Sequence, residues 1–183
     1  MSVQIGLYGT GIMALTGIIW WAFSSARAVA ASEEDIVIET ETPQVMSPDE
    51  LVDLGTGNNA ELILGARIAS ARNRVFIAGG ISKALYTMLR DYLPYQSSLE
   101  MLINPSFPGK ILLYEIQNRF ATNIRQTDKI LKDTVTFINI DGEYVFLLIN
   151  ATHQVLAARD REAATKLSVT NNNLWRGARP YTI

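Results

Sequence analysis

A long apolar run opens the chain. From Val3 to Phe23 almost every residue is apolar, and residues 1–26 contain no Asp, Glu, Lys, Arg or His. A helix over this run would be about 31 Å long at 1.5 Å per residue, which matches the hydrocarbon core of a bilayer. Trp20 and Trp21 close the run where membrane interfaces favour aromatic rings, and Arg27 is the first charged side chain. The pattern predicts one transmembrane anchor over residues 1–28.

Two other interpretations of this run remain open. Ala28-Val29-Ala30 fits the small-x-small pattern of a signal-peptide cleavage site, although no basic region precedes the run and the run is longer than most signal sequences. A buried core helix is the second alternative, but such a helix would offer no polar face to water. We therefore expect an anchor rather than a cleaved or buried segment.

Small residues recur within the run at helical spacing. Gly6, Thr10, Ala14 and Gly17 follow one another at intervals of four, four and three, which places them on one stripe of a helix. Such stripes allow the backbones of two helices to approach closely in lipid, although glycine is also common in transmembrane helices generally. The stripe predicts contact with another transmembrane helix.

A polar connector follows over residues 29–57. Residues 33–53 hold eight acids and no base, whereas residues 54–183 hold the other ten acids and fifteen bases, a net charge of about +5. Residues 36–38 could form a short strand. Ser47-Pro48-Asp49-Glu50 predicts the start of a short helix, because Ser is a good N-cap, Pro suits the first helical position and Glu the third. The acidic segment is either a solvated linker or a docking segment for a basic partner.

The pattern from residue 58 onward alternates between short apolar runs and amphipathic segments. Asn58 or Asn59 is expected to cap a helix that runs to about Arg72 with Leu62, Ala66 and Ala69 facing inward. Residues 82–93 are amphipathic, with Leu85, Met88 and Leu89 on one side. Thr134–Ile140 and Tyr144–Ile149 flank Asp141-Gly142, a dipeptide typical of a hairpin turn. The expected elements are helices at 58–72, 82–93, 111–120 and 161–174, and strands at 75–78, 99–103, 129–131, 134–140, 144–149 and 155–158.

This order predicts an α/β domain over residues 58–175, with a mixed β-sheet flanked by helices, and a tail over residues 176–183. The composition excludes several kinds of chemistry. The chain has no cysteine, so disulfides and thiolate catalysis are excluded, and its one histidine, His153, cannot build a histidine-rich metal site. We therefore expect no cofactor and no metal.

Four local matches within residues 58–175 resemble one half of the phospholipase D-like superfamily, and they are most similar to its small single-domain bacterial endonucleases. Residues 74–78 resemble the first core strand, residues 82–85 the helix after it, and residues 136–146 the signature strand and turn. Asn150-Ala151-Thr152 resembles the Asn-x-Thr end of the next strand. The resemblance implies a mixed sheet, a phosphodiesterase ancestry and a motif HxKxxxxD, in which His attacks phosphorus, Lys holds a phosphate oxygen and Asp orients the His.

The motif is degenerate in this chain. Alignment on Asp141 places Thr134 at the His position and Thr136 at the Lys position, while Asp141 and Asn150 remain. A threonine hydroxyl is un-ionised at neutral pH and brings no positive charge to a phosphoryl transition state. The resemblance also implies small residues where Leu147 and Leu148 stand, so the site would be filled with apolar bulk. Asp141 is then interpreted as a turn residue, and His153 as a surface or strand-end residue.

The sequence favours a non-catalytic accessory or structural subunit of a larger membrane protein complex, with other membrane subunits and the lipid bilayer as partners. The alternatives are a diverged phosphodiesterase or nuclease, and a non-catalytic binder of anionic lipid or, less favoured, nucleic acid. Because Arg27 is the only side-chain charge that flanks the anchor and counts in the positive-inside rule, the domain is expected on the cytoplasmic side of a bacterial-type inner membrane. Candidate anion contacts are Arg67, Arg72, Arg74, Lys83 and Arg90.

Overall fold

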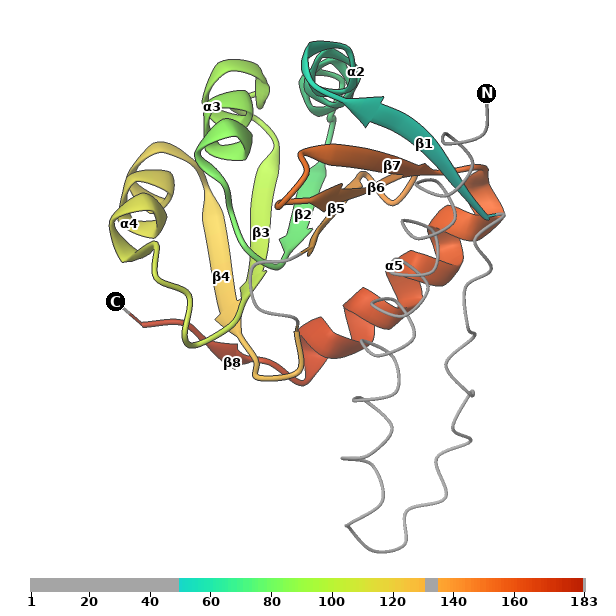
Figure 1. The fold of residues 1–183 in the computed structure, drawn as a ribbon. Helices are drawn as coiled ribbons and strands as arrows, with labels where there is room; N and C mark the ends of the chain where they lie inside the picture. The colour runs from blue at the N-terminus through green and yellow to red at the C-terminus, as the bar shows by residue number, and fades with distance from the viewer. Residues whose placement is uncertain (1–49, 131–134, 183) are drawn as a thin grey trace, which may run out of the picture. The chain divides into compact units, whose positions relative to one another are not determined.

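A computed structural model describes residues 50–130 and 135–182. In these residues one eight-stranded sheet is flanked by four helices (Figure 1). The strands are β1 (Leu51–Thr56), β2 (Arg74–Ala78), β3 (Ser98–Ile103), β4 (Thr122–Gln126), β5 (Val135–Ile140), β6 (Tyr144–Ile149), β7 (Gln154–Ala158) and β8 (Arg179–Pro180). The helices are α2 (Asn58–Ala69), α3 (Lys83–Tyr92), α4 (Lys110–Arg119) and α5 (Arg161–Arg176).

The sheet is mixed, as the alternation of elements predicts. Its strand order is β1-β7-β6-β5-β2-β3-β4-β8. The βαβ units pair β2, β3 and β4 in parallel, whereas the short turns after β5 and β6 make those neighbours antiparallel. The antiparallel pairing of β2 with β5 joins the two halves. This junction places the end of β2 beside the start of β5.

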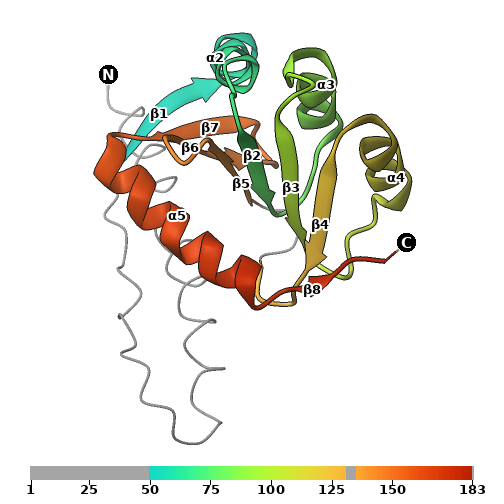
Figure 2. The same ribbon diagram turned by 180° about the vertical axis from the view of Figure 1, so that it is seen from behind.

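The two faces of the sheet carry different layers. Val75 and Ile77 of β2 point into the main core beneath α2, α3 and α4, together with Leu89 of α3. Phe76 points to the opposite face, where its ring meets the Trp175 ring of α5 edge-on at a centroid distance of 5.6 Å. The alternation of side chains along a strand therefore gives β2 a buried contact on both faces. Figures 1 and 2 show α5 lying across the face opposite the other helices.

The hairpin of β5 and β6 agrees with the prediction from Asp141-Gly142. Both residues have positive φ, 55° and 78°, as a tight hairpin turn requires. The N–H of Glu143 donates to the C=O of Ile140 at 3.0 Å, while Ile140 pairs with Tyr144 in the ladder. Glu143 is therefore an extra residue between the two paired strands, and the turn is one residue longer than predicted.

Of the predicted helix start at residues 47–50 only Glu50 is described, and it has 3₁₀-helical conformation, but no helix continues from it. Residues 51–56 form β1, which pairs with β7 in the register Leu51 with Ala158 and Asp53 with Leu156. The local capping signal is overridden by a partner strand about a hundred residues away in the sequence. The strand belongs to the sheet, so the folded domain begins before residue 58.

The inward face predicted for the helix after residue 58 is also wrong. Leu62 is 61% exposed, and Ala66 and Ala69 are exposed, whereas Leu64 and Ile68 are fully buried. Gly57 precedes the helix without a side-chain cap, and the helix ends at Ala69. Apolar residues occur on both sides of α2, so the pattern alone did not identify the buried side.

Three smaller differences concern the second half of the chain. In the segment predicted as a strand at 129–131, residues 129 and 130 form a turn and a bend. A strand that was not predicted, β4, lies just before them, at the polar sequence Thr122–Gln126. The expected tail contains β8, a two-residue strand on β4. The helix predicted at residues 161–174 extends to Arg176.

The predicted anchor, with its small-residue stripe and its interface residues, lies outside the described residues, as do residues 36–38 and Thr134. Within residues 50–130 and 135–182, no helix has the length and apolar character needed to cross a membrane.

Candidate functional site

Thr136 and Asn150, two of the residues that the sequence comparison aligned with the motif, lie at the edge of the sheet where β2 and β6 end and β5 begins. Thr136 is the second residue of β5 and pairs with Leu148 of β6. Asn150 follows β6 directly, and Gly79 and Gly80 follow β2. Because β6 and β2 both run antiparallel to β5, their ends meet its start. We call this group of four residues, Gly79, Gly80, Thr136 and Asn150, the Thr136 edge.

Thr136 is fully buried, with 0% of its surface exposed. Its hydroxyl donates its only proton to the C=O of Gly80 and accepts a hydrogen bond from Nδ2 of Asn150 at 3.1 Å. The hydroxyl is thus satisfied as donor and as acceptor by neutral groups. The residue that the sequence comparison aligned with the motif's Lys is therefore a neutral side chain enclosed by its neighbours.

The backbone closes tightly around this position. Gly79 has φ 120°, and a Cβ built on it would lie 2.5 Å from the C=O oxygen of Val135 and 3.2 Å from Cα of Thr136. Only glycine allows β2 and β5 to approach this closely here. The Gly-Gly that follows a buried strand in the sequence was the signal for this close approach, but the sequence reasoning used it only to end the strand.

The two leucines expected to fill the site lie on different faces. Leu148 pairs with Thr136 and is 4% exposed in the main core. Leu147 pairs with Phe137, so strand alternation points it toward the face that α5 covers. The expectation of a floor made of both leucines is therefore wrong for Leu147, because neighbouring residues of a strand point in opposite directions.

Asp141 lies at the other end of β5 from Thr136. Asp141 is five positions after Thr136, a distance of about 17 Å along an extended strand. The Asp141 carboxylate accepts hydrogen bonds from the backbone N–H groups of Arg72, Asn73 and Arg74, at 2.7, 2.9 and 2.8 Å. It fastens the loop between α2 and β2 to the hairpin turn. The carboxylate has no contact with Thr136 at the motif's Lys position.

The charge on Asp141 is stabilised by this loop. Partial burial acts to raise the pKa of the carboxyl, but the three backbone N–H groups outweigh burial and lower the pKa below its ordinary value. A carboxylate held in this way is ionised and structurally engaged, so it is not poised to exchange a proton near neutral pH.

His153 lies in the turn between β6 and β7. Its side chain is exposed and its φ is 54°, a left-handed conformation that histidine adopts more readily than most residues. In the described part of the chain, no group of three or more His, Cys, Asp or Glu side chains could hold a metal ion.

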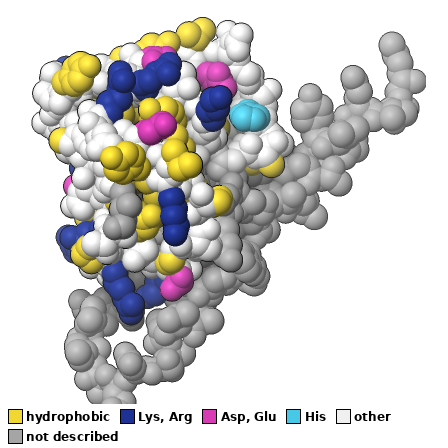
Figure 3. All heavy atoms as spheres, turned by 90° about the vertical axis from the view of Figure 1, so that its left-hand side faces the viewer, with side chains coloured by type: hydrophobic (Ala, Val, Ile, Leu, Met, Phe, Trp, Pro, Cys, Tyr) yellow, Lys and Arg dark blue, Asp and Glu magenta, His cyan; other side chains and the backbone are white. Residues whose placement is uncertain are grey.

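The five candidate anion contacts do not form one cluster. Arg74 forms an ion pair with Glu100 at 3.2 Å, and Arg90 pairs with its neighbour Asp91 at 2.7 Å. Lys83 lies at the opposite end of α3 from Arg90, and Arg67 stacks on the Tyr144 ring with 4.3 Å between the guanidinium carbon and the ring centroid. Arg72 is exposed just after α2. Figure 3 shows the face at the left of Figure 1, where lysine and arginine side chains are interspersed with acidic and hydrophobic ones.

Comparison with known proteins gives a likeness at the level of structure only. No protein-family model matches the chain, and no curated protein matches it. NucT from Helicobacter pylori has a TM-score of 0.51 at 16% identity, over 72% of this chain and 97% of that one. Nuc from Salmonella typhimurium, a phospholipase D family member, has a TM-score of 0.50 at 15% identity, over 75% and 95%. TrmBL2, an archaeal chromatin protein, has a TM-score of 0.49 at 14% identity, over 97% and 68%.

The likenesses to NucT and Nuc define the class of domain: it has a phospholipase D-like fold. At this level of identity they establish the fold and not the activity.

Proposed function

We propose that this chain is a non-catalytic accessory or structural subunit of a larger membrane protein complex, anchored by residues 1–28 and built on an inactive phospholipase D-like domain. One observation carries the proposal. At the motif position where a lysine would hold a phosphate oxygen, Thr136 is fully buried and its hydroxyl is occupied by Gly80 and Asn150. Phosphoryl transfer depends on positive charge placed around the transferring group, and this position offers none.

The sequence at the His position supports the same proposal. Thr134 cannot act as an imidazole nucleophile, because its hydroxyl would need an adjacent base. Asp141 is not such a base in this arrangement, since its carboxylate accepts three backbone hydrogen bonds at the far end of β5. The chemistry that remains at the Thr136 edge is hydrogen bonding between neutral groups, which suits a structural role.

A hydrolysis assay tests the inactive site. The purified full-length chain should cleave a generic phosphodiester such as bis(p-nitrophenyl) phosphate no faster than a buffer blank. The double variant Thr134→His, Thr136→Lys should also stay at background, because the lysine would enter a position enclosed by Gly80, Asn150 and the main core. Turnover by the native chain that disappears in Thr136→Val would refute the proposal.

Co-purification tests the role as a subunit. A tagged chain isolated from membranes in mild detergent should bring the same proteins in constant proportion. Gly6→Leu and Gly17→Leu should release these partners while the chain stays in the membrane, because a leucine on the small-residue stripe keeps two helices apart. Gly11→Leu, which lies off the stripe, is the matched control. If both stripe variants retain the partners as the wild type does, the stripe does not mediate assembly.

A further inference from the structure

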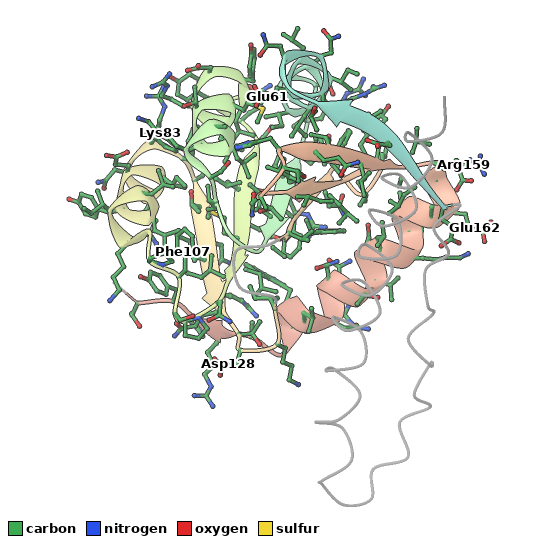
Figure 4. The ribbon with its side chains drawn as sticks, in the orientation of Figure 1. Glu61, Lys83, Phe107, Asp128, Arg159 and Glu162 are labelled. Atoms are coloured by element: carbon green, nitrogen blue, oxygen red, sulfur yellow. The ribbon has the colours of Figure 1, made fainter. Side chains whose placement is uncertain are left out.

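A groove lies at the edge of the sheet opposite the Thr136 edge. It occupies about 500 Å³ between α2, the start of β6, the end of β7 and the first turn of α5. Apolar residues line part of it, among them Ile63 and Phe146. Arg67, Arg159, Arg161 and Tyr144 also line it. Figure 4 shows Arg159 between the end of β7 and the start of α5.

None of the three arginine side chains has its charge neutralised by an acidic side chain of the described residues. Arg67 is held over the Tyr144 ring at 4.3 Å, which fixes its guanidinium at the groove without neutralising it. Arg159 and Arg161 are exposed. Within residues 50–130 and 135–182, none of the three forms an ion pair, whereas Arg74 and Arg90 each have an acidic partner.

Two acidic residues, Glu143 and Asp160, also line the groove, and they affect which kind of anionic ligand it can bind. Asp160 caps α5 by accepting the N–H of Ala163 at 3.0 Å, so its charge is committed to the helix. Glu143 is exposed at the hairpin turn. A phosphate backbone offers only acceptors, so it has no donor for the Glu143 carboxylate. An acidic peptide offers carboxylates to the arginines and backbone N–H groups to Glu143.

We propose that this groove binds an acidic peptide segment of a partner protein, in which an apolar side chain lies between glutamates or aspartates. The apolar residue would pack beside Ile63 and Phe146, and the flanking carboxylates would meet Arg159 and Arg161 on one side and Arg67 on the other. This inference rests on the proposed function, because it says what kind of partner segment a non-catalytic subunit would bind. The groove is separated from the Thr136 edge by the length of β5.

The test uses the full-length chain in an uncharged detergent and a fluorescein-labelled peptide built from Glu-Glu-Leu repeats. Binding is followed by anisotropy, with empty micelles as the blank. The peptide should bind, and more weakly as NaCl is raised. The variant Arg159→Gln, Arg161→Gln should bind at least about tenfold more weakly, because it loses two charge-assisted contacts. Lys110→Gln, Lys129→Gln removes the same charge from exposed sites elsewhere and should bind like the wild type.

Control ligands separate the occupants. A peptide with Gln in place of Glu, and one with Ser in place of Leu, should each bind several-fold more weakly than the parent. Inorganic phosphate at the concentration of the peptide should not displace it. The inference is overturned if no peptide binds, if both double variants lose binding equally, or if a short DNA duplex binds more tightly with the same dependence on Arg159 and Arg161. A negative result here leaves the hydrolysis and co-purification results unaffected, so the two proposals fail separately.

Discussion

Through its side chain, Asp141 holds the hairpin turn after β5 to the loop that enters β2. Its backbone has φ 55°, which suits the turn, and its carboxylate accepts three N–H groups from the loop that enters β2. The sequence predicted only the first of these two features. The Asp-Gly pair predicted the turn, but the bonds to Arg72, Asn73 and Arg74 join residues almost seventy positions apart, and no local pattern records them.

The substitution Asp141→Asn should therefore destabilise the domain in a pH-dependent way. An asparagine keeps the turn conformation but loses the negative charge and at least one of the three bonds, at a cost of about 2 kcal/mol at pH 7. Because the folded state lowers the pKa of Asp141, the charge contributes stability above the ordinary aspartate pKa of about 4, and that contribution is lost as the pH falls through the folded pKa.

Urea unfolding of the wild type and Asp141→Asn at pH 7 and pH 3 measures this difference. The gap between the two proteins should narrow at the lower pH. Asp128→Asn changes an exposed aspartate in a turn and should match the wild type at both values. A gap that stays constant with pH would mean that the charge of Asp141 contributes nothing.

Thr136 is the residue on which the inactive-site interpretation depends. Thr136→Val conserves shape but removes the hydroxyl, which leaves the Gly80 C=O without that donor and the Asn150 amide without that acceptor in a buried setting. The expected loss is about 1–3 kcal/mol in the free energy of unfolding. Thr165→Val removes a hydroxyl that bonds the Arg161 C=O on an exposed turn of α5, and should cost less than about 0.5 kcal/mol. Equal losses would show that the buried contacts of Thr136 have no special weight.

At the scale of elements, patterns succeeded where one face of an element is clearly apolar. Ser82 caps α3 by accepting the N–H of Leu85 at 3.1 Å, and Leu85, Met88 and Leu89 are buried, as their spacing predicts. Patterns failed where an element depends on distant partners. β1 is stabilised by its pairing with β7, and β4 carries a single buried apolar residue, Ile124. Neither strand has the clear alternation of apolar and polar residues by which a strand is recognised in a sequence.

Gly79 joins two elements that local patterns treat separately. Gly79→Ala should destabilise the domain by at least about 3 kcal/mol, because the new Cβ would meet the Val135 C=O of β5 at 2.5 Å and φ is 120°. Gly57→Ala is the matched comparison. Its φ is also positive, at 78°, but no atom lies within 4 Å of the added Cβ. Its φ of 78° with ψ of −160° should cost about 1–3 kcal/mol of backbone strain, without the added clash that Gly79→Ala meets. Thermal and urea unfolding of both variants would measure the difference, and similar losses would mean that the β2–β5 contact yields easily.

At the scale of the whole molecule, the sequence predicted the class of the domain. The mixed α/β sheet and the phospholipase D-like fold agree with the structure. The sequence did not predict the arginine groove, because Arg67 and Arg159 are brought together only by the packing of α2 beside β7. The proposed binding surface is formed by residues from distant segments that the fold brings together. The spacing of apolar residues within one segment carries no information about such a surface.

The proposed anchor gives residues 1–28 the task of holding the chain in a membrane. A chain that lacks residues 1–28 should move from the membrane fraction to the soluble fraction, because it loses the apolar run from Val3 to Phe23. Alkaline carbonate extraction of membranes from cells expressing each form measures the partition. Full-length chain should resist extraction, and Gly11→Leu, which keeps the run apolar, should behave like it. If the full-length chain is extracted as readily as the truncated one, residues 1–28 do not span the membrane, and the proposed anchor is wrong.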